Sequence, residues 1–166
     1  SKTQNTKRII CLGDSLTAGF GLTKEQAYPA LLQKELDASN KQWKVINAGV
    51  SGNTSAGGLR RLEWYFAKKV DVLILALGAN DGLRGLEPAS TFANLDAMLR
   101  RLRAAGVAVL LAGMKAPPNL GAEYGAEFDA IFPRLAKKHG VALYPFFLAG
   151  VAARPELNQE DGIHPN

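Results

Sequence analysis

The sequence predicts a doubly wound α/β fold: a three-layer α/β/α sandwich around a five-stranded parallel sheet. Five short apolar runs indicate buried strands, and four amphipathic stretches between them indicate helices. Glycines at Gly106 and Gly140 follow two of the helical stretches, where helix C-caps are expected. Because strands and helices alternate throughout, we expect right-handed crossovers with helices on both faces of the sheet.

The elements follow one another along the chain in a regular order. Each expected strand is a nearly continuous apolar run, which is typical of a strand covered on both faces. Each expected helix carries apolar residues at helical spacing with polar residues between them. The strands are expected at residues 8–12, 44–48, 70–77, 107–113 and 141–147, and the helices at 26–38, 55–69, 88–105 and 122–139.

Length and composition predict one globular domain over residues 1–166. The chain has 166 residues and is 47% hydrophobic, which is enough for one core. No apolar run approaches the roughly 20 residues that span a bilayer, so we expect no stable membrane insertion. Residues 2–7 are polar and lack the apolar core of a signal peptide, although an exported origin stays open. Cys11 is the sole cysteine, which excludes an internal disulfide and predicts a buried filler in a strand.

The net charge of +5 has an ordinary explanation. The basic pairs lie in stretches with helical periodicity, which favours solvated helix faces. No aromatic residues alternate with these bases as they do in single-strand binders, so we expect no nucleic-acid partner. The weaker alternative is a mild attraction to anionic lipid or acidic products.

Glycine-containing polar segments follow several of the predicted strands. They lie at residues 13–15, 49–53 and 78–82, and the fifth strand leads towards Asp161 and His164. In open parallel sheets, ligands bind beyond the carboxyl ends of the strands, so these segments are expected to converge on one site. Ser15 at the end of the first strand is therefore a candidate nucleophile. A tight turn is the alternative interpretation of residues 13–15.

A serine nucleophile needs a base, and the chain has two histidines. His139 ends a predicted helix, where a cation complements the helix carboxyl end, so we interpret it as structural. His164 remains as the base, and Asp161, three residues earlier, could orient its imidazole. For this segment alone, an Asp-Gly turn followed by a His-Pro loop is the alternative.

A tetrahedral intermediate also needs hydrogen-bond donors aimed at its oxyanion. We expect these donors to be the backbone N–H of Ser15, the backbone at Gly49 and the side-chain amide of Asn80. A tight turn at Gly49 and an Asx turn at Asn80 are the structural alternatives.

Taken together, these residues resemble the four sequence blocks of the SGNH, or GDSL-type, hydrolases. The blocks are residues 13–16, Gly49, residues 78–81 and residues 161–165, in the family's order and over essentially the whole chain. The segments 48–55, 80–85 and 145–147 are similar to the bacterial multifunctional thioesterase/lysophospholipase/arylesterase branch.

The resemblance implies a flavodoxin-like fold and a specific chemistry. Ser15, Asp161 and His164 would form the catalytic triad, and Ser15, Gly49 and Asn80 the oxyanion hole. The substrates would be small-molecule esters and thioesters of fatty acyl chains, hydrolysed without a metal or organic cofactor. The resemblance also implies a periplasmic or secreted enzyme, and we expect a monomer.

Two features depart from related patterns. Thr17 stands where a Gly-x-Ser-x-Gly motif would require glycine, so no sharp nucleophile elbow is expected. In the resembling branch a further helix follows the histidine, whereas this sequence stops at Asn166. We therefore expect the fold to lack the usual C-terminal helix, with reduced stability or compensating contacts.

Five residues in the loops are candidates for a wall that contacts the acyl chain, although ordinary loop packing explains them equally well. They are Leu83, Leu86, Pro117, Leu120 and Tyr124.

A carbohydrate O-acetylesterase of the same family is the nearest alternative function. A noncatalytic flavodoxin-like binding module is a further one, but the chain has neither a P-loop nor a dinucleotide-binding motif.

Overall fold

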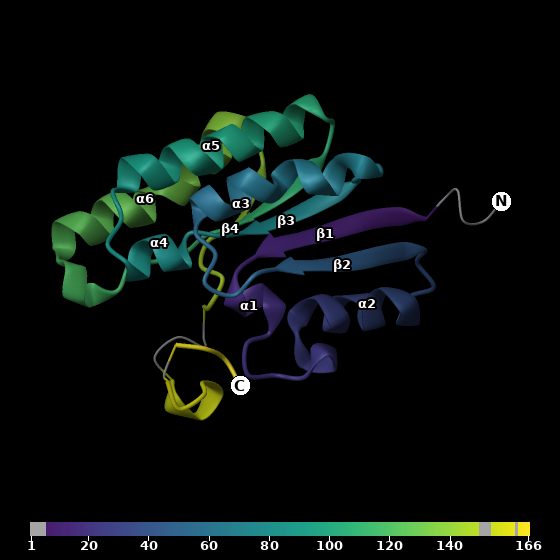
Figure 1. The fold of residues 1–166 in the computed structure, drawn as a ribbon, viewed down its shortest axis with the longest axis horizontal. Coiled ribbons are helices and arrows are strands. Elements are labelled where there is room, and N and C mark those ends of the chain that lie inside the picture. Colours follow the sequence, from purple (N-terminus) through teal and green to yellow (C-terminus); the bar gives the residue numbers. More distant parts are fainter. Residues whose placement is uncertain (1–5, 150–153, 162) are drawn as a thin grey trace.

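Five parallel strands form one sheet in the order β2-β1-β3-β4-β5, which confirms the predicted α/β fold (Figure 1). The structure is a computed structural model, and it describes residues 6–149, 154–161 and 163–166. The strands are β1 (Lys7–Gly13), β2 (Trp43–Gly49), β3 (Val72–Ala76), β4 (Ala108–Ala112) and β5 (Ala142–Tyr144).

Helices cover both faces of this sheet. On one face α2 packs against β2, and on the other α5 lies between α3 and α6 (Figure 1). The α-helices are α1 (Ser15–Ala18), α2 (Tyr28–Ala38), α3 (Ser55–Arg61), α4 (Ala79–Leu83), α5 (Pro88–Ala104) and α6 (Ala122–His139). Short 3-10 helices are η2 (Lys24–Gln26), η3 (Leu62–Ala67), η4 (Pro118–Leu120) and η5 (Pro155–Leu157). Within the described ranges, none of the helices has both the length and the hydropathy to cross a bilayer.

The main core lies between the sheet and the layer of α3, α5 and α6. Because side chains alternate along a strand, Leu73 and Leu75 of β3 point to the same face. Their register partners Val109 and Leu111 on β4 are buried with them. Helix side chains such as Leu102 and Phe132 complete this cluster.

The last strand is shorter than the apolar run at 141–147 predicts. β5 covers only Ala142–Tyr144, and Pro145 follows it directly. The chain bends there instead: Gly113 N–H donates to the Tyr144 carbonyl at 2.7 Å, and Phe147 N–H donates to the Gly113 carbonyl at 2.8 Å. Apolar composition therefore continues past the point where the strand ends.

Two short helices that the sequence analysis did not predict form the edge where the site lies. α1 begins two residues after β1, and α4 begins three residues after β3. β1 and β3 are neighbours in the sheet, so both helices lie at the same carboxyl edge. From β1 the chain continues to β2 on one side, and from β3 to β4 on the other, which is the switch point where open α/β sheets bind ligands.

Candidate active site

Ser15 lies in the first turn of α1, directly beyond the end of β1. The carboxylate of Asp14 caps the helix by accepting a hydrogen bond from the Leu16 N–H at 2.9 Å. The preceding Gly13 is required by packing, because a Cβ there would lie 2.0 Å from Thr17 Oγ1. These contacts fix the position of Ser15 beyond the end of β1, where 8% of its surface is exposed.

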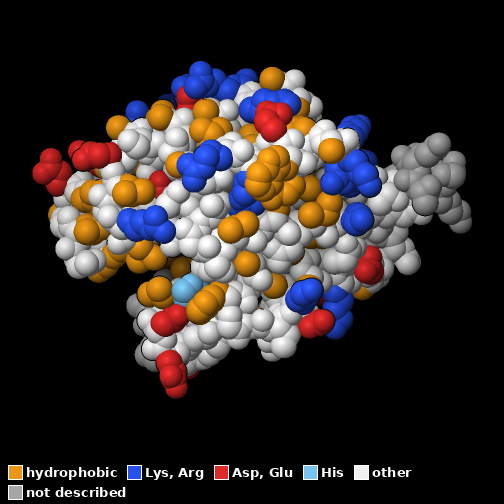
Figure 2. All heavy atoms as spheres, viewed as in Figure 1, with side chains coloured by type: hydrophobic (Ala, Val, Ile, Leu, Met, Phe, Trp, Pro, Cys, Tyr) orange, Lys and Arg blue, Asp and Glu red, His pale blue; other side chains and the backbone are white. Residues whose placement is uncertain are grey.

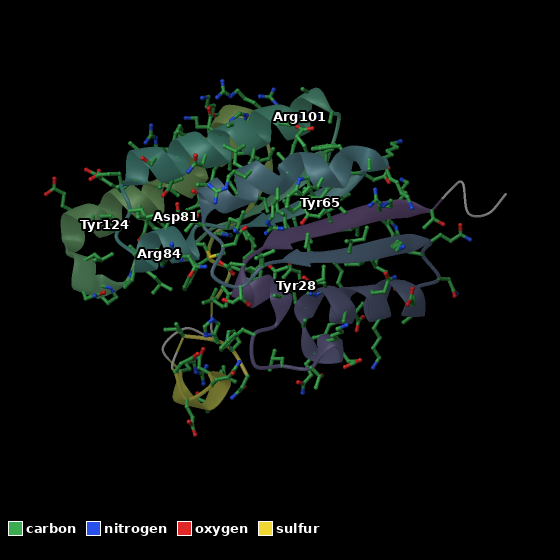
Figure 3. All side chains as sticks on the ribbon, in the orientation of Figure 1. Tyr28, Tyr65, Asp81, Arg84, Arg101 and Tyr124 are labelled. Atoms are coloured by element: carbon green, nitrogen blue, oxygen red, sulfur yellow. The ribbon has the colours of Figure 1, made fainter. Side chains whose placement is uncertain are left out.

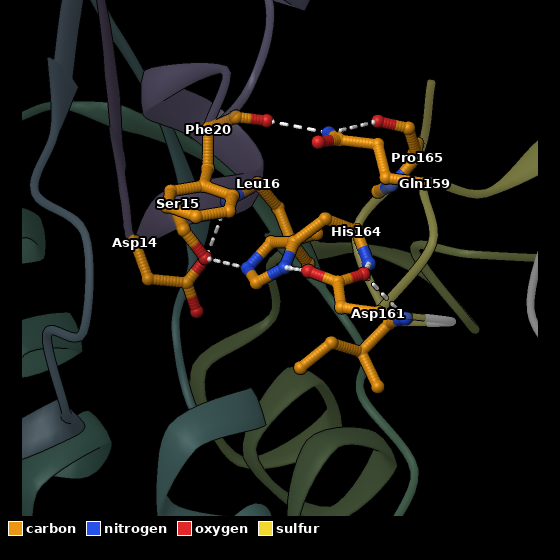
Figure 4. Close-up of polar contacts among 9 residues, drawn as sticks. Asp14, Ser15, Leu16, Phe20, Gln159, Asp161, His164 and Pro165 are labelled. Atoms are coloured by element: carbon orange, nitrogen blue, oxygen red, sulfur yellow. Dashed lines mark hydrogen bonds and ion pairs between the residues drawn. The ribbon is translucent and has the colours of Figure 1, made fainter.

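The structure brings together the three residues of the predicted triad. His164 Nε2 lies 2.8 Å from Ser15 Oγ, and His164 Nδ1 lies 2.6 Å from Asp161 Oδ2 (Figure 4). An ionised carboxylate can only accept a hydrogen bond, so the proton of the neutral imidazole belongs on Nδ1. Nε2 then presents a lone pair to the hydroxyl of Ser15. This arrangement can take up the serine proton when the oxygen attacks an acyl carbon.

Asp161 is held by the same short turn that it shares with His164. Its Oδ1 accepts the N–H groups of Ile163 and His164, each at 3.0 Å. The hydrogen bond from the His164 side chain, followed by these two backbone bonds, lowers the pKa of Asp161 below its ordinary value. Asp161 is therefore ionised at neutral pH. Gly162, which the sequence motif includes, lies outside the described residues.

Asn80 lies in the first turn of α4, which follows β3, and β3 is the neighbour of the strand β1 that precedes Ser15. Its Nδ2 donates to the carbonyl of Asn53 at 3.0 Å and, more weakly, to Asp14 Oδ2 at 3.4 Å. The Ser15 N–H has no hydrogen-bond partner among the described residues. The Ser15 N–H can therefore donate to an oxygen atom bound in front of Ser15, and the Asn80 amide can do so by giving up its long contact with Asp14.

The following residue, Asp81, anchors α4 to the neighbouring helices α3 and α5 (Figure 3). It is 2% exposed and accepts hydrogen bonds from the N–H and Oγ of Ser55 at 2.8 and 2.6 Å. Thr91 Oγ1 donates to the same carboxylate at 2.8 Å. Asp81 thus joins α3, α4 and α5, and its bonds fix the helix on which Asn80 lies.

Gly49 is engaged differently from the expectation that it donates to an oxyanion. Its N–H donates to the side-chain Oδ1 of Asn47 at 2.9 Å. Its α-carbon packs against α1, since a Cβ there would lie 2.2 Å from the Ala18 nitrogen. Gly49 therefore allows β2 and α1 to approach each other closely.

Gly52, three residues further on, has the open surroundings and the available N–H that we expected of Gly49. Its φ is +77°, and no atom lies within 4 Å of the position of a Cβ. Its N–H has no partner among the described residues, and the next carbonyl, that of Asn53, accepts the bond from Asn80. Gly52 lies in the same polar segment, residues 49–53, as Gly49, and the sequence alone does not distinguish their two N–H groups.

A cavity of about 310 Å³ opens beside Ser15 and His164. Two of the five predicted wall residues, Leu83 and Pro117, are in its lining. The other large apolar side chains around it, which the sequence analysis missed, are Leu16, Met114, Phe146, Leu148 and Ile163. Figure 2 shows a hollow that contains a histidine side chain with hydrophobic side chains on both sides.

The remaining three wall candidates are not among the described residues that line the cavity. The Tyr124 hydroxyl donates to the carbonyl of Leu86 at 2.6 Å, and its ring stacks on Phe128 with centroids 6.0 Å apart. Leu120 lies against Gly85 at the end of α4. These contacts join the loop that follows α4 to η4 and α6, which agrees with the loop-packing interpretation.

His139, the other histidine, lies away from this site. It is buried at the end of α6, and its Nε2 lies 2.7 Å from Asp96 Oδ1 on α5. Arg103 lies on the other side of the ring, with Nη1 3.3 Å from Nδ1. The contacts of His139 therefore connect two helices.

Known proteins with similar sequences match this chain over almost its whole length. Esterase TesA of Pseudomonas aeruginosa is 44% identical over 158 residues, which are 95% of this chain and 79% of that protein. Thioesterase 1/protease 1/lysophospholipase L1 of Escherichia coli K12 is 42% identical over 159 residues, or 95% and 75%. The crystal structure of AlinE4, an SGNH-hydrolase family esterase, superposes with a TM-score of 0.90 and 47% identity, covering 98% of this chain and 87% of that one.

The family signature agrees with these relatives. Residues 11–166 match the GDSL-like lipase/acylhydrolase family, a span that begins inside β1 and includes Ser15, Asn80, Asp161 and His164. The chain therefore belongs to the GDSL-like lipase/acylhydrolase family of ester-hydrolysing enzymes.

Proposed function

We propose that this protein is a serine esterase that hydrolyses carboxylic esters and thioesters of fatty acyl chains through an acyl-enzyme on Ser15. The observation that carries the proposal is the continuous hydrogen-bonded series from Ser15 Oγ through His164 to Asp161, with distances of 2.8 and 2.6 Å. This series lies at the edge of an apolar cavity. Relatives named arylesterase and thioesterase 1/lysophospholipase L1 support the same substrate class.

In the first half of the reaction, Ser15 Oγ attacks the acyl carbon while His164 Nε2 takes the hydroxyl proton. The imidazolium that forms is stabilised by the ionised Asp161. His164 then gives the proton to the leaving alkoxide or thiolate, and the acyl group remains on Ser15. In the second half, a water molecule is activated by His164 in the same way and releases the fatty acid.

The negative charge on the tetrahedral oxygen needs donors that are already in place. We assign this role to the N–H of Ser15, the side-chain amide of Asn80 and the N–H of Gly52 in place of that of Gly49. The support for Gly52 is its unpaired amide among the described residues and its place beside Asn53, which holds Asn80. Losing one such donor typically lowers kcat by about a hundredfold to a thousandfold.

The size and lining of the cavity favour fatty acyl chains over acetate. Its volume of about 310 Å³ falls at the lower end of ordinary ligand pockets. Met114, Phe146 and Leu148 provide an apolar surface that an acetyl group could not fill. Transfer of each additional buried methylene from water contributes about 0.8 kcal/mol, so longer chains gain binding energy until the cavity is full.

A fluorophosphonate probe tests the role of Ser15 directly. The wild-type protein is expected to be labelled at Ser15 and to hydrolyse p-nitrophenyl esters. Ser15→Ala and His164→Ala should each lower kcat by at least about a thousandfold without unfolding, because triad members act as a unit. His139→Ala is the control for loss of a histidine, and it should keep kcat. Near-native esterase activity in Ser15→Ala would refute the mechanism.

A chain-length series separates the two ester-hydrolase alternatives. We expect kcat/KM for p-nitrophenyl esters to rise from acetate to medium chains, with matching activity on acyl thioesters. Activity on acetate alone would favour a carbohydrate O-acetylesterase. A noncatalytic binding module would show neither turnover nor labelling.

The location that we propose, periplasmic or secreted, rests on the family resemblance. Fractionation of cells that produce the protein tests it, and recovery in the cytoplasmic fraction alone would contradict it.

A further inference from the structure

Phe20 makes a contact with His164 that the proposed mechanism does not use. It lies just beyond α1, and its ring contacts the imidazole in a tilted arrangement, with centroids 4.4 Å apart and planes inclined by 39° (Figure 4). Phe20 is 49% exposed, so it adds little to the core. It is also not among the described residues that line the acyl cavity. Among the described residues, the imidazole of His164 is the one aromatic ring that it contacts.

The side chain of Gln159 joins the segment of Phe20 to the segment of His164. Its Nε2 donates to the carbonyl of Phe20 at 2.6 Å and to the carbonyl of Pro165 at 2.9 Å. Its backbone N–H donates to the carbonyl of His164 at 2.8 Å. Figure 4 shows this bridge beside the two rings, between residues that lie 139 positions apart in the sequence.

The surfaces around the amide of Gln159 fit closely. Gly21 lies against it, and a Cβ on Gly21 would be 1.9 Å from Gln159 Oε1. The φ of Gly21 is +76°, a conformation that also favours glycine. On the other side, Asn158 and Pro165 form an antiparallel bridge that closes the turn carrying Asp161 and His164. The amide thus lies between two backbone segments that approach each other.

We propose that Phe20 and Gln159 are positioning residues for His164, an inference that rests on the proposed role of His164 as the base. The hydrogen bonds to Ser15 and Asp161 act at the two ring nitrogens, in the plane of the imidazole. The tilted ring of Phe20 adds a contact outside that set of hydrogen bonds and limits the movement of the imidazole towards it. The hydrogen bond from Gln159 to the carbonyl of Phe20 fixes the backbone position from which the Phe20 ring reaches the imidazole.

The same contact favours the charged state of the base. When His164 accepts the serine proton, the imidazolium lies 4.4 Å from the centroid of the Phe20 ring, and a cation within about 6 Å of an aromatic ring is attracted to it. The neutral imidazole of the ground state gains less from the ring. The contact therefore stabilises the transition state more than the enzyme–substrate complex, and its loss should appear in kcat rather than KM.

Replacing the ring tests the contact with the imidazole. Phe20→Leu keeps an apolar side chain and is expected to lower kcat by about tenfold, with KM within about twofold of the wild type. Phe20→Tyr keeps the ring and should restore most of kcat. Trp64→Leu, at a 74% exposed aromatic outside the cavity, is the matched control and should leave both constants unchanged.

A pair of glutamine variants tests the bridge. Gln33 makes a similar bridge between α2 and β2, with Nε2 donating to the Trp43 carbonyl at 2.8 Å and Oε1 accepting the Val45 N–H at 2.7 Å. Gln159→Leu and Gln33→Leu are both expected to lower the melting temperature. Gln159→Leu alone should lower kcat, by about tenfold or more. Equal losses of kcat in the two variants would overturn the positioning role of Gln159.

The His164→Ala background separates this inference from the proposed function. If Phe20 acts through the imidazole, Phe20→Leu should have no effect on the residual rate of His164→Ala. An unchanged kcat in Phe20→Leu, or a change in KM alone, would overturn the role of Phe20 while leaving the proposed function intact. Near-native activity in His164→Ala would instead refute the proposed function itself.

Discussion

Asp14 is a buried carboxyl group one residue before the nucleophile. It is 1% exposed, and desolvation raises its pKa from 3.8 to about 6, although the hydrogen bond from the Leu16 N–H opposes this rise. Its other oxygen accepts the weak bond from Asn80. The contacts of Asp14 are with the backbone of α1 and with Asn80, so its first role is to hold the turn that presents Ser15.

The raised pKa of Asp14 predicts a specific pH dependence of stability. The protonated group is favoured in the folded state, so its contribution is complete below pH 3.8 and is lost as the pH rises through about 6. Asp14→Asn cannot ionise and keeps an oxygen acceptor for Leu16. Its free energy of unfolding should therefore exceed that of the wild type above pH 6, by on the order of 2 kcal/mol, and approach it near pH 4. Urea denaturation across this range measures the difference, and a constant difference would contradict the prediction.

Single residues differ in how far the sequence could reveal them. Ser15, Asp161 and His164 were predictable as a group, because together they supply a nucleophile, a base and a carboxylate in the order of a known family's sequence blocks, although each segment alone is typical of a turn. The contact of Phe20 with His164 was not, since nothing in either local segment specifies which distant ring will lie against the imidazole. Gly49 was expected in the oxyanion hole because a glycine lets the backbone approach a substrate closely and because the family resemblance implies it, but neither ground shows where its N–H points.

The junction between β2 and α1 depends on two residues at the end of β2. Asn47 Nδ2 donates to the Thr17 carbonyl at 3.0 Å, while Oδ1 accepts the Gly49 N–H. Gly49 lies so close to α1 that its missing side chain is a condition of the contact. Since α1 begins at Ser15, the end of β2 helps to set the position of the nucleophile.

Gly49→Ala should therefore affect both stability and catalysis. The new Cβ would lie 2.2 Å from a backbone nitrogen, which cannot move without shifting α1. We expect a loss of about 1–3 kcal/mol in the free energy of unfolding, together with a lower kcat. Gly125→Ala in α6 is the matched control, because no atom lies within 4 Å of its Cβ and alanine favours the helix by up to about 1 kcal/mol. Equal stabilities of the two variants would contradict the packing argument.

The boundaries of the elements were less predictable than their order. The helix predicted at 122–139 coincides with α6, because its apolar spacing continues to a C-cap at Gly140. The helix predicted at 55–69 is instead α3 followed by the 3-10 helix η3. The short helices α1 and α4 contain four and five residues, too few for a periodic pattern to be recognised.

At the scale of the whole molecule, the site depends on how α6 supports α4. The rings of Phe128 and Phe132 on α6 pack edge to face with centroids 5.7 Å apart. They reach beneath α4, where a Cβ on Gly82 would lie 3.1 Å from Phe128, and one on Gly78 would lie 3.0 Å from Phe132. α6 follows β4 in the chain, whereas α4 follows β3, so the fold brings the support of Asn80 from a separate β-α unit.

Removing this support should lower catalysis beyond its effect on stability. Phe128→Ala is expected to cost about 3–5 kcal/mol and to leave a cavity into which α4 can shift, moving Asn80 away from Ser15. Leu102→Ala, at a fully buried position near the C-terminal end of α5, should lower the free energy of unfolding by about 2–5 kcal/mol without moving α4. At a temperature well below both melting transitions, only Phe128→Ala should have a reduced kcat per folded molecule. If both variants kept the wild-type kcat, the position of α4 would be independent of α6, and the bonds of Asp81 alone would have to hold Asn80 in place.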